Sequence, residues 1–202
     1  MLIRLAFCSI CELDDDLSVT IDSLPFGENE KTRLRSIKNE TAKRESLAAL
    51  LALCKLCGDA ALTILRDGQG RGKPYFSEEG APHFSLSHAG GVAVAAVCDA
   101  LEVGVDLETV RDSFDQAAVA RRFFTASEQE EFSRNGDFFA LWTRKEARAK
   151  CLGASLSAVL SEDISLPART YRADGITLSL AAEREFEVEF LNHIFSNQEV
   201  LL

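Results

Sequence analysis

The sequence LWTRKEARAKCLG, residues 141–153, places a tryptophan and one carboxylate, Glu146, among four cations. We expect a helix here from about Asp137 to Leu152, because Gly153 follows at the position where a helix commonly ends. Glu146 and Lys150 are four residues apart in the order that stabilises a helix by about 0.2–0.5 kcal/mol. A solvated helix face would look similar, so the rest of the sequence must decide what this helix does.

The flanking segments predict a mixed α and β fold. A helix is expected over residues 39–58, where Asn39 can cap the start and Gly58 can end it. Two strands should surround a turn at Gly90–Gly91, and another strand should include the sequence GVDLE, residues 104–108. Two further helices should precede the one from Asp137 to Leu152, the first through residues 117–124 and the second starting at Thr125. Strands should follow at residues 175–180 and 185–191.

Length and composition fit one large domain or two small halves that share a core, since the chain has 202 residues and is 47% hydrophobic. The sequence contains no run of 18 apolar residues that would predict a membrane span, and its first residues lack the pattern of a secretory signal. We therefore expect a cytoplasmic protein. Two C-x-x-C pairs occur, Cys8 with Cys11 and Cys54 with Cys57. We favour core packing for these cysteines over a zinc or redox site, because Cys54 falls in an apolar stripe.

The net charge of −10 argues against a nucleic-acid partner, which would require a basic surface. Residues 30–73 nevertheless carry ten cations and five anions, so this segment is +5 and the remainder is −15. Two interpretations stay open: an ordinary charged helix face, or a pocket for a small ligand with several negative charges.

The carboxylates of Asp106 and Glu108 lie two residues apart, which places them on one face of a strand. At about 4 Å and an effective dielectric near 20, they would repel by roughly 4 kcal/mol. When two carboxylates are partly buried together, the pKa of one is therefore raised, or the pair contacts cations or binds a metal ion. Carboxylate oxygens are hard ligands, and such ligands favour Mg²⁺. Glu146 could supply a third carboxylate, but a strand end facing solvent is an equally simple explanation.

Three other residues have ordinary structural explanations. Thr125 to Glu128, TASE, has the capping-box pattern of a helix start, which explains Glu128 without a catalytic role. His88 precedes a Gly-Gly turn, and Lys73 lies in a loop sequence, GRGKPYF.

Five short motifs nevertheless occur in a fixed order. They are GKPYF (72–76), FSLSH (84–88), GVDLE (104–108), FFTASE (123–128) and WTRKEARAKCLG (142–153). Together they resemble the motifs of Sfp-type 4′-phosphopantetheinyl transferases over residues 35 to 155. The pairing of G-x-D-x-E with W-x-x-K-E-x-x-x-K at this separation is the most specific part of the resemblance.

The resemblance implies an α+β fold in which two similar α/β halves, residues 1–100 and 101–202, pack as a pseudo-dimer around a shared cleft. It implies a Mg²⁺-dependent enzyme that moves the phosphopantetheine arm of coenzyme A to a serine of an apo acyl or peptidyl carrier protein. The implied carrier proteins serve fatty acid, polyketide or peptide synthesis. The chain could form its complete site as a monomer, and neither nucleic acid nor a membrane is an expected partner.

The implied roles fall on particular residues of this sequence. Asp106, Glu108 and Glu146 would be Mg²⁺ ligands, and Glu146 or a neighbouring carboxylate would be the base. Lys150 would meet the reacting phosphate. The implied coenzyme A contacts are Lys31, Arg44, Lys73, Ser87, His88, Lys145 and Lys150.

The sequence departs from the family pattern at several positions. Ser85 stands where Asn is usual and Arg148 where an apolar residue is frequent. Three alternatives stay open: a coenzyme A-binding homologue without activity, a Mg²⁺-dependent phosphohydrolase with water as acceptor, and an adaptor whose basic segment binds a partner.

Overall fold

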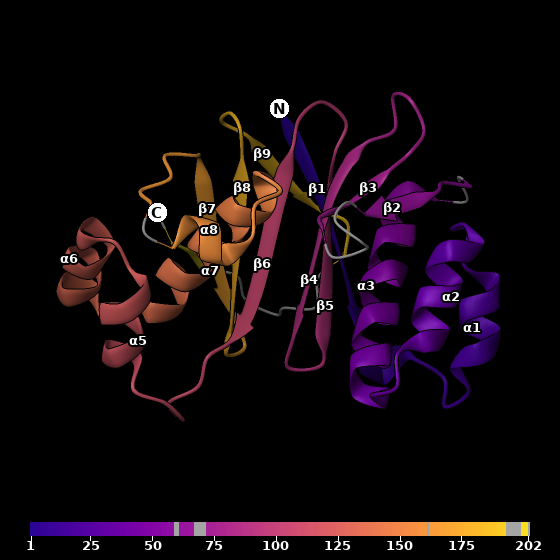
Figure 1. The fold of residues 1–202 in the computed structure, drawn as a ribbon, viewed down its shortest axis with the longest axis horizontal. Helices are drawn as coiled ribbons and strands as arrows, with labels where there is room; N and C mark the ends of the chain where they lie inside the picture. The colour runs from indigo at the N-terminus through magenta and orange to yellow at the C-terminus, as the bar shows by residue number, and fades with distance from the viewer. Residues whose placement is uncertain (59–60, 67–71, 161, 193–198, 202) are drawn as a thin grey trace.

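In the part of the chain that the structure describes, the strands form two four-stranded sheets and one two-stranded sheet, and the main helices cover the outer faces of the two larger sheets (Figure 1). The structure is a computed structural model that describes residues 1–58, 61–66, 72–160, 162–192 and 199–201. Its mixed α+β character agrees with the sequence prediction.

Before the middle of the chain come β1 (Leu2–Ser9), a 3₁₀ turn (Ile10–Glu12), α1 (Leu17–Ser23), α2 (Glu28–Ser36), α3 (Glu40–Cys57), β2 (Ile64–Arg66), β3 (Pro74–Phe76), β4 (His83–Ala89) and β5 (Val92–Cys98). After it come β6 (Val103–Thr109), α5 (Gln116–Phe123), α6 (Ala126–Asn135), α7 (Phe138–Cys151), α8 (Leu156–Val159), β7 (Ala168–Ala173), β8 (Ile176–Ala182), β9 (Glu187–Phe190) and β10 (Glu199–Leu201).

The first sheet has the strand order β4-β5-β1-β9, and the second has the order β10-β7-β8-β6. Neighbouring strands run antiparallel except for β1 and β9, which pair in parallel. The two-stranded β2–β3 hairpin lies beside the first sheet's strand β4. Strands β4 and β6 are therefore the edge strands at which the two sheets approach each other.

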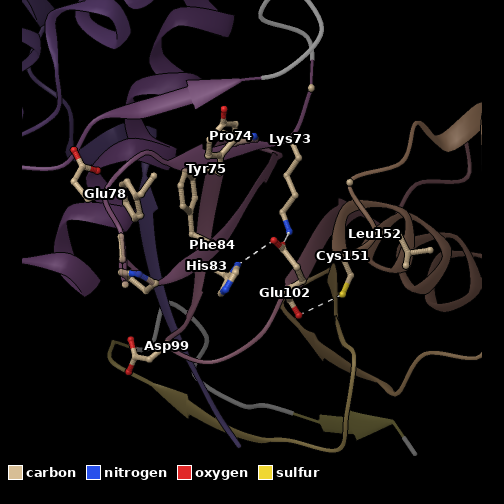
Figure 2. A pocket seen from close by; sticks show the side chains of 16 residues that line it. Lys73, Pro74, Tyr75, Glu78, His83, Phe84, Asp99, Glu102, Cys151 and Leu152 are labelled. Atoms are coloured by element: carbon tan, nitrogen blue, oxygen red, sulfur yellow. Dashed lines mark hydrogen bonds and ion pairs between the residues drawn. The ribbon is translucent and has the colours of Figure 1, made fainter.

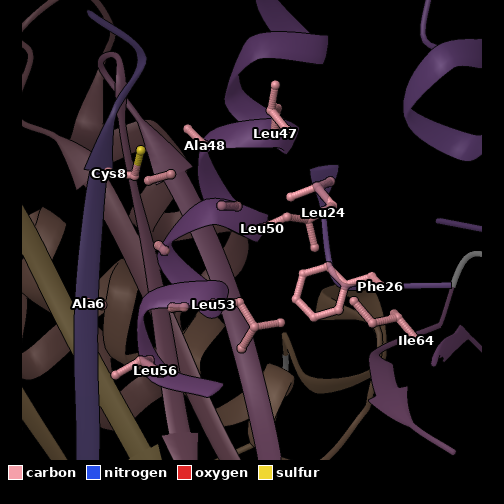
Figure 3. Close-up of a cluster of buried hydrophobic side chains, with 14 of the residues drawn as sticks. Ala6, Cys8, Leu24, Phe26, Leu47, Ala48, Leu50, Leu53, Leu56 and Ile64 are labelled. Carbon is pink, nitrogen blue, oxygen red and sulfur yellow. The ribbon is translucent and has the colours of Figure 1, made fainter. Parts of the chain in front are cut away.

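Alternation along the strands builds two separate cores. Ile3, Leu5 and Phe7 of β1 meet Val103, Val105 and Leu107 of β6 in a core between the sheets. The opposite face of the first sheet packs against α3, as Ala6, Cys8, Leu50 and Leu53 show (Figure 3). Because successive strand residues point to opposite faces, this pattern also fixes the direction of the polar residues of β6.

Most of the predicted elements are confirmed. Helix α3 begins after the Asn39 cap, whose side chain accepts a hydrogen bond from Ala42, and ends at Gly58. Thr125 and Glu128 form the predicted capping box of α6, and α7 runs from Phe138 to Cys151. Cys8, Cys54 and Cys57 pack in or against the core under α3, as predicted, but the prediction is wrong for Cys11, which is exposed.

The end of the chain differs from a simple division into halves. Strand β9 follows residue 101 in sequence, yet it pairs with β1 in the first sheet. Strand β10 instead pairs with β7 in the second sheet. The two sheets are thus tied together by the chain after β8. No helix in the described ranges is both long and apolar enough to cross a membrane.

Candidate active site

Gly104 allows helix α7 to lie directly on strand β6. A Cβ atom at this position would stand 1.8 Å from the carbonyl oxygen of Ala147 and 2.5 Å from the amide nitrogen of Cys151. Both are backbone atoms of α7, so only glycine permits this approach. This close contact places the turns of α7 that carry Glu146 and Lys150 over the face of β6 from which its polar side chains project.

The two sheets are joined at their edges by serine side chains. The hydroxyl of Ser85 accepts a hydrogen bond from the amide of Val105 at 3.1 Å, and that of Ser87 accepts one from Leu107 at 3.2 Å. Strand amides that would otherwise lack a partner in this buried region are thereby satisfied. Ser85 and Ser87 therefore fix the position of β6 relative to β4.

Asp106 lies at the centre of the site and is 4% exposed. Its Oδ1 atom accepts hydrogen bonds from Ser87 Oγ at 3.0 Å and from Lys150 Nζ at 2.7 Å. Lys150 Nζ also donates to Ser87 Oγ at 3.1 Å. The second carboxylate oxygen of Asp106, Oδ2, is buried and has no hydrogen-bond partner.

Two further carboxylates face this centre. The pKa of Glu146 is raised to about 7, first by burial and then by the charge of Asp106, while Lys150 acts in the opposite direction. Burial and the Asp106 charge also raise the pKa of Glu108, against the effect of Arg111. A carboxyl group that exchanges its proton near neutral pH is suited to general acid–base catalysis.

An aromatic cavity opens beside these two glutamates. Its volume is about 240 Å³, and Glu108 and Glu146 stand in its wall. The other walls include Phe114, Phe139 and Trp142. The Trp142 ring stacks on Phe138 at 5.8 Å between centroids, which fixes the start of α7 in an aromatic cluster. The two glutamates therefore border a cavity whose walls are mainly aromatic and also include Arg111.

The predicted metal ligands share one region but are not arranged as a finished metal cage. Within the described ranges, no three histidine, cysteine, aspartate or glutamate side chains are grouped so as to hold a metal ion. Lys150 occupies one oxygen of Asp106, and the other oxygen is unpartnered. Anionic oxygen donors and a buried unpaired oxygen fit the ligand preferences of Mg²⁺.

His88 follows Ser87 at the end of β4, and its ring nitrogen Nδ1 lies 3.4 Å from Glu45 of α3. Lys73 has a different environment, since its Nζ atom forms an ion pair with Glu102 and donates to the Val103 carbonyl oxygen at 2.9 Å. His83 Nδ1 lies 3.0 Å from the same Glu102 carboxylate.

Lys73, His83 and Glu102 line a second cavity, of about 640 Å³, between the β3–β4 region and the end of α7 (Figure 2). Burial raises the pKa of Glu102, but hydrogen bonds from Lys73 and His83 outweigh it and hold this pKa below its ordinary value. The cavity adjoins Cys151, one residue beyond Lys150. The larger cavity therefore joins residues 72–102 to the end of α7, whereas the residues that line the smaller one all lie between Glu108 and Glu146.

Several cations of the basic segment have partners within the N-terminal helices. Lys31 Nζ donates to the carbonyl oxygen of Asp22 at 2.9 Å. Arg44 donates to the carbonyl oxygen of Asp15 at 3.2 Å and lies 3.5 Å from Glu40. An ordinary charged helix face therefore explains the contacts of Lys31 and Arg44. To bind an anion, each of these side chains would have to leave its present protein partner.

Lys145 is buried, and its Nζ atom lies 2.7 Å from Glu128 Oε2 of α6. This ion pair joins Lys145 to α6, whereas Lys150 pairs with Asp106 of β6.

Sequence reasoning missed the bridging serine Ser85 and the acidic residue Glu102. The two-residue alternation in FSLSH, residues 84–88, signals that Ser85 and Ser87 share a face. Glu102 gives no such signal, because its partners Lys73 and His83 come from distant parts of the sequence.

The sequence model of the 4′-phosphopantetheinyl transferase superfamily matches residues 102–201, the segment that holds Asp106, Glu108, Glu146 and Lys150. This chain is 38% identical over 104 residues to the 4′-phosphopantetheinyl transferase psf-1 of Bacillus pumilus. It is 34% identical over 103 residues to 4′-phosphopantetheinyl transferase AcpT of Salmonella typhimurium, and 36% identical over 110 residues to 4′-phosphopantetheinyl transferase HetI of Nostoc.

These similarities cover about half of each protein. The match to psf-1 covers 48% of this chain and 43% of psf-1. The match to AcpT covers 48% of this chain and 54% of AcpT, and the match to HetI covers 50% of this chain and 46% of HetI. Residues 102–201 thus match the model of that superfamily, and about half of this chain is similar to relatives that bear the name of that enzyme.

Proposed function

We propose that this chain is a 4′-phosphopantetheinyl transferase of the Sfp type. It transfers the 4′-phosphopantetheine arm of coenzyme A to a serine of an apo acyl or peptidyl carrier protein and releases adenosine 3′,5′-bisphosphate. The observation that carries this proposal is the convergence of Asp106, Glu108, Glu146 and Lys150, all inside the segment similar to the transferases, with Ser87 of β4.

The reaction is a displacement at phosphorus. The carrier serine oxygen attacks the phosphorus atom that bears pantetheine, and the bond from that phosphorus to the adenosine bisphosphate oxygen breaks. Glu146 takes the serine proton, a step that contributes roughly 10²–10⁴-fold in such reactions. Its raised pKa, about 7, supports this assignment. Lys150 places a cation where negative charge develops on the phosphoryl oxygens.

The donor set supports Mg²⁺ as the cofactor, with Asp106, Glu108 and Glu146 as its ligands. The unpartnered Oδ2 atom of Asp106 is the clearest indication, because a buried anionic oxygen is costly without a partner. When bound, Mg²⁺ would neutralise charge on the diphosphate. Lys150, which lies at hydrogen-bond distance from Asp106, would help to hold the diphosphate in place.

Ser87 and His88 are proposed to meet coenzyme A at the end of β4. Lys31, Arg44 and Lys73 are proposed as further cations for its phosphates, each exchanging a present protein partner for the ligand. We also propose that residues 1–100 and 101–202 form the two halves of a pseudo-dimer around the site. The enzyme would then act as a cytoplasmic monomer on carrier proteins.

The proposal is tested by incubating the chain with coenzyme A, Mg²⁺ and a panel of apo carrier proteins, followed by mass spectrometry of the carrier. We expect a mass gain of one phosphopantetheine group. Release of free phosphopantetheine without that gain would instead favour the phosphohydrolase. Binding of coenzyme A with neither outcome would favour an inactive homologue.

A further inference from the structure

Lys145 has an unusual environment for a lysine that stands next to a candidate catalytic residue. Its side chain is 2% exposed, and lysine is almost never fully buried unless it is paired. Its Nζ atom lies 2.7 Å from Glu128 Oε2. The same oxygen accepts the amide hydrogen bond of Thr125 at 2.8 Å, which closes the capping box at the start of α6.

The other charges near Lys145 have their own partners. On the same helix, Arg144 forms an ion pair with Glu131 of α6, and Arg148 Nε donates to the Leu166 carbonyl oxygen at 3.0 Å. Asp163, from the segment after α8, accepts hydrogen bonds from Ser127 and Thr125, and these bonds lower its pKa more than the charge of Lys145 does. The charge of Lys145 is therefore directed to Glu128, away from the Asp106 centre.

Helix α7 is consequently held on two flanks. On one flank its backbone rests on Gly104 of β6, and on the other Lys145 joins it to the first turn of α6. Glu146 is the next residue, about 100° further around the helix axis. A small rotation of α7 would carry the Glu146 carboxyl group away from Asp106.

We propose that Lys145 is a positioning residue, whose buried ion pair with Glu128 sets the rotation of α7 and thereby the place of Glu146. This inference rests on the proposed transferase function. It replaces the expectation that Lys145 contacts coenzyme A. The ammonium group acts through Glu128 and the helix, and it does not touch the substrate.

The test compares Lys145→Met, Glu128→Gln, the double variant and Glu131→Gln. Methionine keeps the length of the lysine side chain without its charge, and glutamine can retain the capping box at residue 128. Glu131→Gln is the matched control, because it breaks the neighbouring α6–α7 ion pair between Glu131 and Arg144. Each variant is measured for kcat, for KM and Kd of coenzyme A, and for the side-chain carboxyl ¹³C resonance of Glu146.

We expect Lys145→Met and Glu128→Gln each to lower kcat by about 10- to 100-fold, the range for a small misplacement of a catalytic group. The Kd of coenzyme A should stay unchanged, and the Glu146 resonance should move. The double variant should recover most of the loss, because a neutral pair can replace a buried ion pair. Glu131→Gln should retain the kcat and the resonance of the parent.

A raised Kd for coenzyme A with an unchanged kcat in Lys145→Met would overturn the proposal and return Lys145 to the ligand contacts. An unchanged kcat together with an unmoved Glu146 resonance would also overturn it. If Lys145→Met does not fold, Glu128→Gln and the double variant test the same pair. If the parent chain transfers nothing, the transferase proposal fails, while the resonance still reports whether Lys145 positions Glu146.

Discussion

Replacing Gly104 with alanine perturbs the contact that brings α7 onto β6. The added Cβ atom would stand 1.8 Å from the Ala147 carbonyl oxygen, and ordinary contact begins at 3.4 Å. Helix α7 must therefore retreat by roughly 1.6 Å, since a backbone oxygen cannot rotate out of the way. That movement separates Glu146 and Lys150 from Asp106.

The expected cost has two parts. Overpacking of this kind lowers the free energy of unfolding by about 1–3 kcal/mol. A displacement near 1 Å at a catalytic group lowers the rate by about 100-fold. Urea unfolding at 25 °C measures the first quantity, and the rate of holo-carrier formation by mass spectrometry measures the second.

Gly136→Ala is the control for lost stability without displacement of α7. Gly136 ends α6 with a φ of 69°, and a Cβ atom there would meet nothing within 4 Å. Its replacement should cost about 1 kcal/mol through backbone strain alone and leave transfer unchanged. A Gly104→Ala variant with the stability and the rate of the parent, or a Gly136→Ala variant that loses transfer to the same extent, would contradict this role of Gly104.

Three other predictions concern single carboxylates. Glu146→Gln should slow transfer by about 10²–10⁴-fold, because the variant has no carboxylate to take the serine proton; transfer at the parent rate would contradict this role. Asp106→Ala should abolish transfer and leave the circular dichroism spectrum unchanged, whereas transfer at the parent rate would exclude Asp106 from the site. Glu30→Gln should lower the free energy of unfolding at pH 7 by about 3 kcal/mol, because it leaves Arg66 and Arg33 without their buried partner. Glu28 is the control, since its carboxylate is 75% exposed, and Glu28→Gln should change the free energy of unfolding by less than about 1 kcal/mol.

The Glu30 variant also has a pH signature. Burial raises the pKa of Glu30, but the hydrogen bonds from Arg66 and Arg33 outweigh it, so this pKa is lowered in the folded chain. A lowered pKa means that the stabilisation is present above the unfolded pKa and is lost as the pH falls through the folded pKa. Glu30→Gln should therefore weaken the acid-side decline of stability in urea titrations, and an unchanged decline would contradict the assignment.

Local patterns predicted the parts of the fold that depend on nearby residues. The Asn39 cap, the Gly58 end and the Thr125–Glu128 capping box are set within one or two turns of chain, so sequence identified them. The alternation of GVDLE likewise placed Asp106 and Glu108 on one face of β6, opposite the residues that enter the core between the sheets.

Features that depend on distant contacts could not be predicted in this way. The parallel pairing of β9 with β1 joins residues at opposite ends of the chain. The long side chains of Lys73 and Lys145 take partners, Glu102 and Glu128, that are set by how the elements pack. Gly104 was recognised only as part of a motif, and its physical role required the position of the α7 backbone.

We propose that Asp106, Glu108 and Glu146 together hold the diphosphate of coenzyme A through a divalent cation. A crystal structure of the chain with coenzyme A and Mn²⁺, which marks the metal by anomalous scattering, tests it most directly. We predict one anomalous peak in contact with oxygens of these three side chains and of the diphosphate, with Lys150 beside the phosphate. A diphosphate bound elsewhere, or a peak that Glu146 does not approach, would contradict the claim.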